Sequence, residues 1–190
     1  YCDRVRFFAE GFWLLMSGCG VGFSVQKHHI ARLPRLITAG QRDARINKVH
    51  VVADSIEGWA DAVLALVSSY MPTDEEQAKY CINFHYDQVR PEGSPISIGG
   101  VAPGPQVLKT AIERVKAVLD QAVDDSQYKI RPIQAFDIFM HISHAALLSS
   151  RRAATIALFS PDDDEMMTAK TGDWWMTQPQ RAYANISAQI

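Results

Sequence analysis

Two adjacent arginines, Arg151 and Arg152, are the residues of this sequence that most suggest chemistry. They lie between a stretch typical of a helix end and an apolar run typical of a strand. Neighbouring guanidinium groups repel each other unless an anion lies close by, and a phosphate group meets that requirement. The ordinary alternative is that one arginine pairs with a carboxylate such as Asp162 while the other is solvated. The pair therefore indicates either a phosphate-binding loop or a surface ion pair.

A glycine-rich turn, Gly18-Cys19-Gly20-Val21-Gly22, is a second candidate for ligand contact. It resembles the start of a dinucleotide-binding fingerprint, but the third glycine of that fingerprint falls at Phe23, and the expected order is helix, turn, strand. This order argues against a nicotinamide dehydrogenase. Glycines in such a turn allow the backbone to approach a ligand closely, and a purely structural turn is the alternative.

Several groups of histidines, cysteines and carboxylates could contribute metal ligands. None of them is followed by a second pair at the spacing of a structural zinc site, so we predict ordinary surface or core residues and no metal site. The acidic run from Asp162 to Glu165 is expected in the first turn of a helix, where carboxylates complement the helix dipole. These groups are His28-His29, Cys81 with His85, His141 with His144, and Asp162 to Glu165.

The composition, with 190 residues of which 47% are hydrophobic and 21% charged, is that of one globular domain or a large part of one. The formal charge of -2 gives no general attraction to nucleic acid or to a membrane surface, so we expect neither as a partner. Three cysteines at unrelated spacings favour a reducing compartment, by default the cytoplasm. Because the chain begins without an initiator Met and ends inside a β-like run, we expect a piece of a longer protein.

Helices and strands are expected to alternate along the chain, which is an α/β pattern with at least part of a parallel sheet. Apolar residues at steps of three and four predict amphipathic helices over residues 4–16, 55–70, 107–119 and 134–148. Runs of β-forming residues predict strands over 20–25, 49–53, 80–86 and 153–159, of which 49–53 is expected to be buried. The region from His28 to Asn47 is expected to be an exposed, partly irregular connection.

The helix over 55–70 has the clearest start. Asp54 is predicted as its N-cap, with Glu57 three residues later as in a capping box. Pro161 and Asp163 are expected to open a further helix after the strand over 153–159.

Six blocks of residues, taken in order, resemble the adenosylcobalamin-dependent, or class II, ribonucleotide reductases, especially the monomeric ribonucleoside-triphosphate reductase type. The family fold is a ten-stranded α/β barrel, and the resemblance implies that residues 1–190 form a partial reductase barrel domain with an inserted effector-binding region. The blocks are residues 18–25, Asp54 to Trp59, Arg90-Pro91 with Gly93, Gly99-Gly100 with Gly104-Pro105, Arg151-Arg152-Ala153, and Ala184-Asn185 with Ser187.

The resemblance further implies two stretches that serve a deoxynucleoside triphosphate effector. They are an effector region over 21–32 and a longer insertion over 40–163, which ends with a specificity loop around 149–153. Ser149-Ser150 replaces the usual Gly-Asn of that loop, and Ile186 stands where a second Asn is common. The Asp54 carboxylate and the Ser55 hydroxyl lie at a predicted helix start, where polar side chains face an end that a ligand can reach. This position suits the effector role that the resemblance implies for both residues. The implied effector-binding residues are Val21, Gly22, Phe23, Ser24, Asp54, Ser55, Arg151 and Arg152.

The resemblance also implies what the parent protein does. The family reduces ribonucleoside triphosphates to deoxyribonucleotides for DNA synthesis by thiyl-radical chemistry, with adenosylcobalamin as cofactor and a thioredoxin-like reductant, and the implied parent is a monomer. Its catalytic cysteine and glutamate lie in an Asn-Pro-Cys-Gly-Glu motif that this chain lacks, so no catalytic residue is expected here and the chain alone is expected to be inactive. Cys19 and Cys81 are expected to be structural thiols, and the main cobalamin contacts are expected beyond Ile190. The alternative is a stand-alone nucleotide-binding regulatory module without reductase activity.

Overall fold

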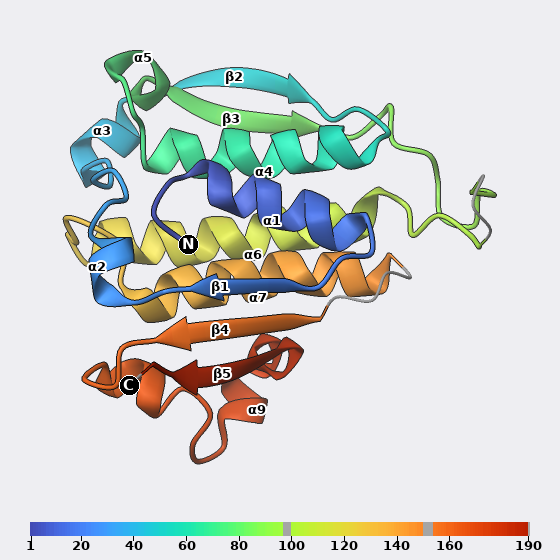
Figure 1. The fold of residues 1–190 in the computed structure, drawn as a ribbon. Helices are drawn as coiled ribbons and strands as arrows, with labels where there is room; N and C mark the ends of the chain where they lie inside the picture. Colours follow the sequence, from blue (N-terminus) through green and yellow to red (C-terminus); the bar gives the residue numbers. More distant parts are fainter. Residues whose placement is uncertain (97–99, 150–153, 190) are drawn as a thin grey trace.

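Helices and strands alternate along the chain in the computed structural model, which describes residues 1–96, 100–149 and 154–189 (Figure 1). The first half contains α1 (Arg6–Met16), β1 (Val21–Ser24), α2 (Lys27–Ile30), α3 (Ala39–Asp43), β2 (Ile46–Val51), α4 (Ile56–Tyr70), α5 (Glu75–Ala78) and β3 (Tyr80–His85). The second half contains α6 (Pro105–Asp124), α7 (Pro132–Leu148), β4 (Thr155–Phe159), α8 (Asp164–Met167), α9 (Trp174–Thr177), the 3-10 helix η1 (Pro179–Tyr183) and β5 (Ala184–Ala188).

Two parallel sheets enclose a layer of long helices. One sheet has the strand order β1-β4-β5 and the other pairs β2 with β3. Helices α1, α4, α6 and α7 lie between the sheets in Figure 1, with β3 against α4 and β4 against α7. The expected α/β pattern with a parallel sheet is therefore confirmed.

The core lies where α7 meets α1 and the larger sheet. Residues on nearly every side of α7 are buried, because neighbouring elements surround it. The Phe139 ring of α7 lies 4.6 Å from the Phe23 ring of β1 and 5.0 Å from the Phe7 ring of α1, measured between centroids. Gly11 permits the close approach of α1, since a Cβ atom at that position would lie 2.5 Å from the Phe139 ring.

Two expectations about β2 and its surroundings need correction. The strand spans Ile46–Val51 rather than 49–53, and it is largely exposed, with Ile46 65% and Val49 54% accessible. The reason is that α4 packs against β3, which leaves β2 on the outer side of the two-stranded sheet. Val52, just after the strand, is buried. The connection before it contains two short helices, and α3 begins with a Thr38–Gln41 capping box that the sequence analysis missed.

The other predicted elements agree with the structure to within a few residues. Asp163 caps α8 as expected by accepting a hydrogen bond from the Met166 N–H at 3.1 Å, although α8 is only four residues long. Within the described part of the chain, no helix has the length and apolar character needed to cross a membrane.

Candidate functional site

A pocket lies where the start of α4 meets the segment that leads from β3 to α6. Its volume is about 120 Å³, close to the roughly 150 Å³ cavity that holds one benzene ring in a well-studied case. It therefore has room for one ring or one phosphate group, and a larger ligand would extend from its open side. The lining residues are Met16, Asp54, Ser55, Ile56, Trp59, Val89, Arg90, Ile96, Ala102, Pro103, Gly104 and Ser149. We call this the α4–α6 pocket.

The start of α4 differs from the prediction in one respect. Ser55, not Asp54, is the N-cap: its backbone is extended, and its Oγ accepts a hydrogen bond from the Gly58 N–H at 2.9 Å. The turn is so tight that a Cβ atom at position 58 would lie 2.5 Å from the Ala53 carbonyl oxygen. Glycine at position 58 therefore allows the tight turn that shapes this wall of the pocket.

The predicted capping box is also wrong in its second member. The Glu57 carboxylate does not close a box, because it accepts a hydrogen bond from Trp13 Nε1 of α1 at 3.2 Å. A hydrogen bond from its own backbone N–H and this bond from Trp13 lower the pKa of Glu57. The side chain thus ties α4 to α1 on the side away from the pocket lining.

Asp54 is free of the capping role and forms an ion pair with Arg90. Arg90 Nε donates to Asp54 Oδ2 at 2.6 Å, and both side chains are partly exposed, 41% for Arg90 and 30% for Asp54. A pair so placed contributes at most about 1 kcal/mol to stability. It does, however, hold one cationic and one anionic group in fixed positions at the pocket. Arg90 was missed as a site residue, although the resemblance had included Arg90-Pro91 among its matching blocks.

The start of α6 contributes a second helix N-terminus to the same pocket. Gly104 precedes α6 with φ of +74°, and a Cβ atom there would lie 2.9 Å from the Glu92 backbone nitrogen, so only glycine fits. No side chain caps this 20-residue helix. Two helix N-termini carry partial positive charge and favour anions. With the apolar contribution of Trp59 and Ala102, the pocket suits a ligand that combines a flat ring with an anionic group.

The four predicted effector-binding residues of β1, Val21 to Ser24, do not line the α4–α6 pocket. Val21 and Gly22 line a second pocket of about 380 Å³, over the starts of β1, β4 and β5. Gly22 faces outward in register with Ile156 of β4, which is in turn in register with Asn185 of β5. We call this the sheet pocket.

Phe23 and Ser24 point into the protein. Phe23 packs in the core, and the Ser24 hydroxyl lies 2.8 Å from His29 Nδ1. Burial lowers the pKa of His29, which favours its neutral form. In this structure both β1 residues support the strand rather than face either pocket.

Arg151 and Arg152 lie outside the described residues, but the residues on each side of them are informative. Ser149, at the end of α7, lines the α4–α6 pocket, and Ala154, at the start of β4, lines the sheet pocket. The four residues 150–153, which include both arginines, therefore connect the two pockets along the chain.

The alternative partner considered for the arginines is already engaged. Lys27 Nζ lies 2.9 Å from Asp162 Oδ2, and this hydrogen bond lowers the pKa of Asp162. A surface ion pair between Asp162 and the arginines would compete with the one that the structure shows.

The thiols and histidines form no reactive or metal-binding cluster in the described part of the chain. Cys2 is buried, Cys19 is exposed and Cys81 is half-buried, and all are free. Burial raises the pKa of the Cys2 thiol, which keeps it protonated. Over residues 1–96, 100–149 and 154–189, no three His, Cys, Asp or Glu side chains come together as a metal site would require.

The fold is similar to that of a segment of a class II ribonucleotide reductase. A solved structure of a B12-dependent (class II) ribonucleotide reductase superposes with a TM-score of 0.77 and 23% identity, covering 96% of this chain and 28% of the other.

The sequence is similar to adenosylcobalamin-dependent ribonucleoside-triphosphate reductases, which confirms the predicted resemblance. The enzyme of Lactobacillus leichmannii is 29% identical, with 82% of this chain and 24% of the relative covered. The probable enzyme of Dictyostelium discoideum is 30% identical, with 70% of this chain and 16% of the relative covered. No protein-family model matches the chain. The chain spans about a quarter of the length of the Lactobacillus relatives.

Proposed function

We propose that this chain is a segment of an adenosylcobalamin-dependent ribonucleoside-triphosphate reductase, an oxidoreductase that makes deoxyribonucleotides in the cytoplasm. The observation that carries the proposal is similarity to such reductases over 82% of the chain. The shared fold over 96% of the chain supports it independently. In the parent, β1, β4 and β5 would be three strands of the ten-stranded α/β barrel wall, since they are parallel and adjacent.

The radical chemistry is assigned to other parts of the parent. This chain lacks the Asn-Pro-Cys-Gly-Glu motif, and its thiols are dispersed. In this proposal the contacts to adenosylcobalamin, like those to the thioredoxin-like reductant, belong to parts of the parent outside residues 1–190.

The test is made on the full-length parent. We expect it to form deoxyribonucleotides from ribonucleoside triphosphates only when adenosylcobalamin and a dithiol reductant are supplied, and residues 1–190 alone to form none. A full-length protein that binds nucleotides but has no cofactor-dependent turnover would favour the regulatory module instead.

Within this parent, we infer that the α4–α6 pocket holds a deoxynucleoside triphosphate effector. Its apolar wall suits a base or sugar, and its two helix N-termini with Arg90 suit phosphate oxygens. Residues 150–153 join this pocket to the sheet pocket. We further infer that the substrate of the parent lies at the sheet pocket. A loop so placed can pass information from the effector to the substrate, because each ligand would contact one end of it.

Replacement of Arg90 tests the pocket directly. In the full-length protein, Arg90→Gln is expected to weaken effector binding by roughly tenfold or more, since a hydrogen bond to a charged group contributes about 1.5–3 kcal/mol. The matched control is Arg4→Gln, which breaks a similarly exposed ion pair with Glu10 at 2.6 Å. Calorimetric titration of the four deoxynucleoside triphosphates measures both. Equal affinities in the two variants would show that the pocket is not the effector site.

A further inference from the structure

A third pocket lies between α3 and the end of α6, and the proposed function makes no use of it. Its volume is about 330 Å³, which falls within the range of about 300–1,000 Å³ that is typical of small-molecule sites. It is lined by residues 35–39, Gln41, Val123 and residues 126–128. We call this the α3–α6 pocket.

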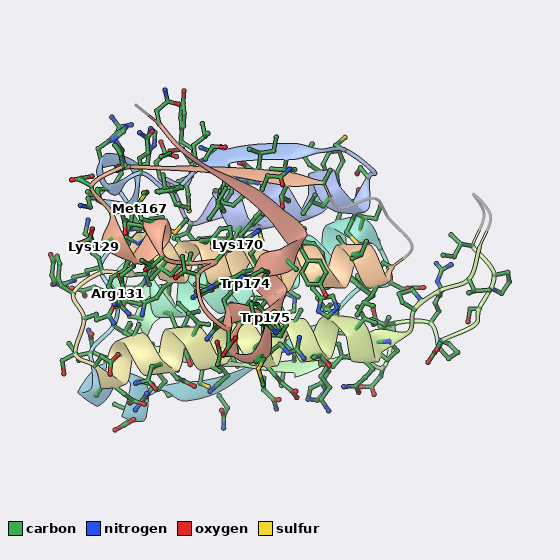
Figure 2. All side chains as sticks on the ribbon, turned by 90° about the horizontal axis from the view of Figure 1, so that it is seen from below. Lys129, Arg131, Met167, Lys170, Trp174 and Trp175 are labelled. Atoms are coloured by element: carbon green, nitrogen blue, oxygen red, sulfur yellow. The ribbon has the colours of Figure 1, made fainter. Side chains whose placement is uncertain are left out.

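The α3–α6 pocket is remote from the α4–α6 pocket. Helix α6 begins beside the α4–α6 pocket, where Gly104 precedes it, and reaches the α3–α6 pocket with Val123 in its last turn. Its 20 residues span about 30 Å at about 1.5 Å per residue. Figure 1 shows α3 at the opposite end of α6 from the connection between β3 and α6, and Lys129, the residue after Tyr128, lies at that same left-hand end in Figure 2. A small ligand therefore occupies only one of the two pockets.

Arg35 provides the α3–α6 pocket with a cation that lacks an anionic partner. Its side chain is exposed, and within the described part of the chain it forms no ion pair and no side-chain hydrogen bond. The nearby carboxylates at the end of α6 are already engaged. Asp124 pairs with Arg42 at 2.7 Å. Asp125 accepts a hydrogen bond from Gln121 Nε2 at 2.8 Å. A ligand with an anionic group would supply the partner that Arg35 lacks.

Two amide side chains of the α3–α6 pocket retain hydrogen-bonding capacity. Gln41 Oε1 accepts a hydrogen bond from the Thr38 N–H at 2.9 Å, while its Nε2 donates none to the described residues. Gln127 Oε1 is buried and has no hydrogen-bond partner among the described residues. A buried acceptor without a partner is unfavourable, and a hydroxyl or amino group of a ligand would satisfy it.

The rest of the wall is apolar and includes one exposed aromatic ring. Leu36, Ile37 and Val123 are at most 4% exposed, whereas Tyr128 is 69% exposed. The backbone that carries this ring is fixed, because the Tyr128 carbonyl accepts a hydrogen bond from the Leu36 N–H at 2.9 Å. An exposed ring on a fixed backbone, beside buried aliphatic side chains, suits the flat ring of a ligand.

We propose that the α3–α6 pocket binds a small aromatic anion, which combines a flat ring, a phosphate or carboxylate group, and a hydroxyl or amino donor. The anionic group pairs with Arg35 and accepts a hydrogen bond from Gln41 Nε2. The ring packs against Tyr128 and the aliphatic wall, and the donor satisfies Gln127 Oε1. This ligand site is additional to the effector and substrate pockets and does not depend on either of them.

Calorimetric titration of the full-length protein tests the site. Adenosine 5′-monophosphate and 4-hydroxybenzoate are the probes, because they combine the three features with a phosphate and with a carboxylate. Effector and substrate triphosphates are present at saturation, without adenosylcobalamin, so that the other two pockets are filled. We expect at least one probe to bind roughly tenfold or more tightly than adenosine and than inorganic phosphate, which each lack one feature. No binding of either probe, or equal binding of adenosine or phosphate, overturns the proposal.

Substitutions then locate the bound probe. Arg35→Gln is expected to weaken its binding by roughly tenfold or more, and Tyr128→Ala by about two- to tenfold. Arg32→Gln is the matched control, because Arg32 is similarly exposed, lies outside the pocket lining and pairs only with Asp3 at 3.6 Å. Both Arg35 and Tyr128 are exposed, so the fold is expected to survive either change.

Equal affinities of Arg35→Gln and Arg32→Gln for the probe overturn the proposal. Turnover is assayed separately in the same preparation after adenosylcobalamin is added. An active, effector-regulated reductase that binds neither probe therefore rejects the α3–α6 pocket alone and leaves the proposed function intact.

Discussion

Gly58 is the residue at which the pocket wall depends most directly on a missing side chain. Gly58→Ala is expected to destabilise the protein by about 1–3 kcal/mol, because the added Cβ would overlap the Ala53 carbonyl and force the turn open. Gly40→Ala is the control, since nothing lies within 4 Å of a Cβ atom at that position. Urea unfolding measures both. A Gly58→Ala midpoint equal to that of Gly40→Ala would contradict the geometry.

Ser55 and Asp54 are neighbours with different roles, and single substitutions separate them. Ser55→Ala is expected to lower the free energy of unfolding by about 1 kcal/mol through loss of the cap to Gly58. Asp54→Ala should change stability less, because it removes only a partly exposed ion pair, yet it should disturb ligand binding at the pocket. If Asp54→Ala proves the more destabilising of the two, the assignment of the cap to Ser55 is wrong.

The wrong prediction of Asp54 as the N-cap shows that sequence patterns do not decide between neighbouring residues that suit the same role. Asp54 and Ser55 are both favourable N-caps, and Glu57 stands three residues after the first of them. The choice is made by tertiary contacts, since Arg90 engages the aspartate and Trp13 engages the glutamate. Neither partner is near in sequence. That both residues lie at a helix start beside a pocket was therefore predictable from residue chemistry, but the division of roles between them was not.

At the scale of elements, periodicity predicted which segments are helices and strands but not how each strand is covered. The run around Val49 has the composition of a buried strand, yet β2 is exposed because only β3 lies against α4. In contrast, α7 is buried on nearly every side, and its Asp137 accepts hydrogen bonds from Gln180 and Arg181 of η1. Burial depends on what packs against an element, which local sequence does not contain.

His141 on α7 makes the stability of this element dependent on pH. Burial lowers its pKa from 6.5 to about 4, and this shift is partly opposed by Asp137 and reinforced by Arg114, His144 and Arg181. The buried Nδ1 has no hydrogen-bond partner among the described residues. Between pH 6.5 and 4 the unfolded chain binds a proton at this residue that the folded chain does not. The free energy of unfolding therefore falls as the pH is lowered through this window and is fully retained above it.

His141→Gln is expected to reduce this dependence, because glutamine does not titrate. Urea unfolding at several pH values should show a smaller loss of stability between pH 6.5 and 4 in the variant than in the wild type. Part of the slope remains, since burial also lowers the pKa values of His29, His50 and His144. Identical slopes in the two proteins would show that folding does not lower the pKa of His141.

At the scale of the whole molecule, the sequence order of similar blocks indicated the family, while the spatial relation of the two pockets emerged only from the fold. Parallel pairing of β1 with β4 places Gly22 beside Ile156, more than a hundred positions away in sequence. The segment between these strands supplies α4 and α6, whose starts form the α4–α6 pocket. No local pattern reports such a juxtaposition, because it follows from the path of the entire chain.

The position of Arg151 and Arg152 between the two pockets leads to a prediction for the parent enzyme. Since Ser149 lines one pocket and Ala154 the other, an effector that favours one arrangement of residues 150–153 would alter what the substrate meets. Coupling of this kind is typically about 1–3 kcal/mol, or roughly a 5- to 150-fold change in relative affinity. We expect Arg151→Ala or Arg152→Ala to keep the fold and effector binding while substrate preference becomes nearly independent of the effector present.

Competition among the substrates, with and without each effector at saturation, measures this loss of coupling. Ordinary surface arginines would change binding by only a few tenths of a kcal/mol, so the two accounts differ by a measurable amount. Arg90→Gln provides the contrast, because it should weaken effector binding while leaving the coupling intact once effector is saturating. If both loop variants respond to every effector as the wild type does, residues 150–153 connect the pockets in sequence only, and the effector must act through the packing of α4 and α6 instead.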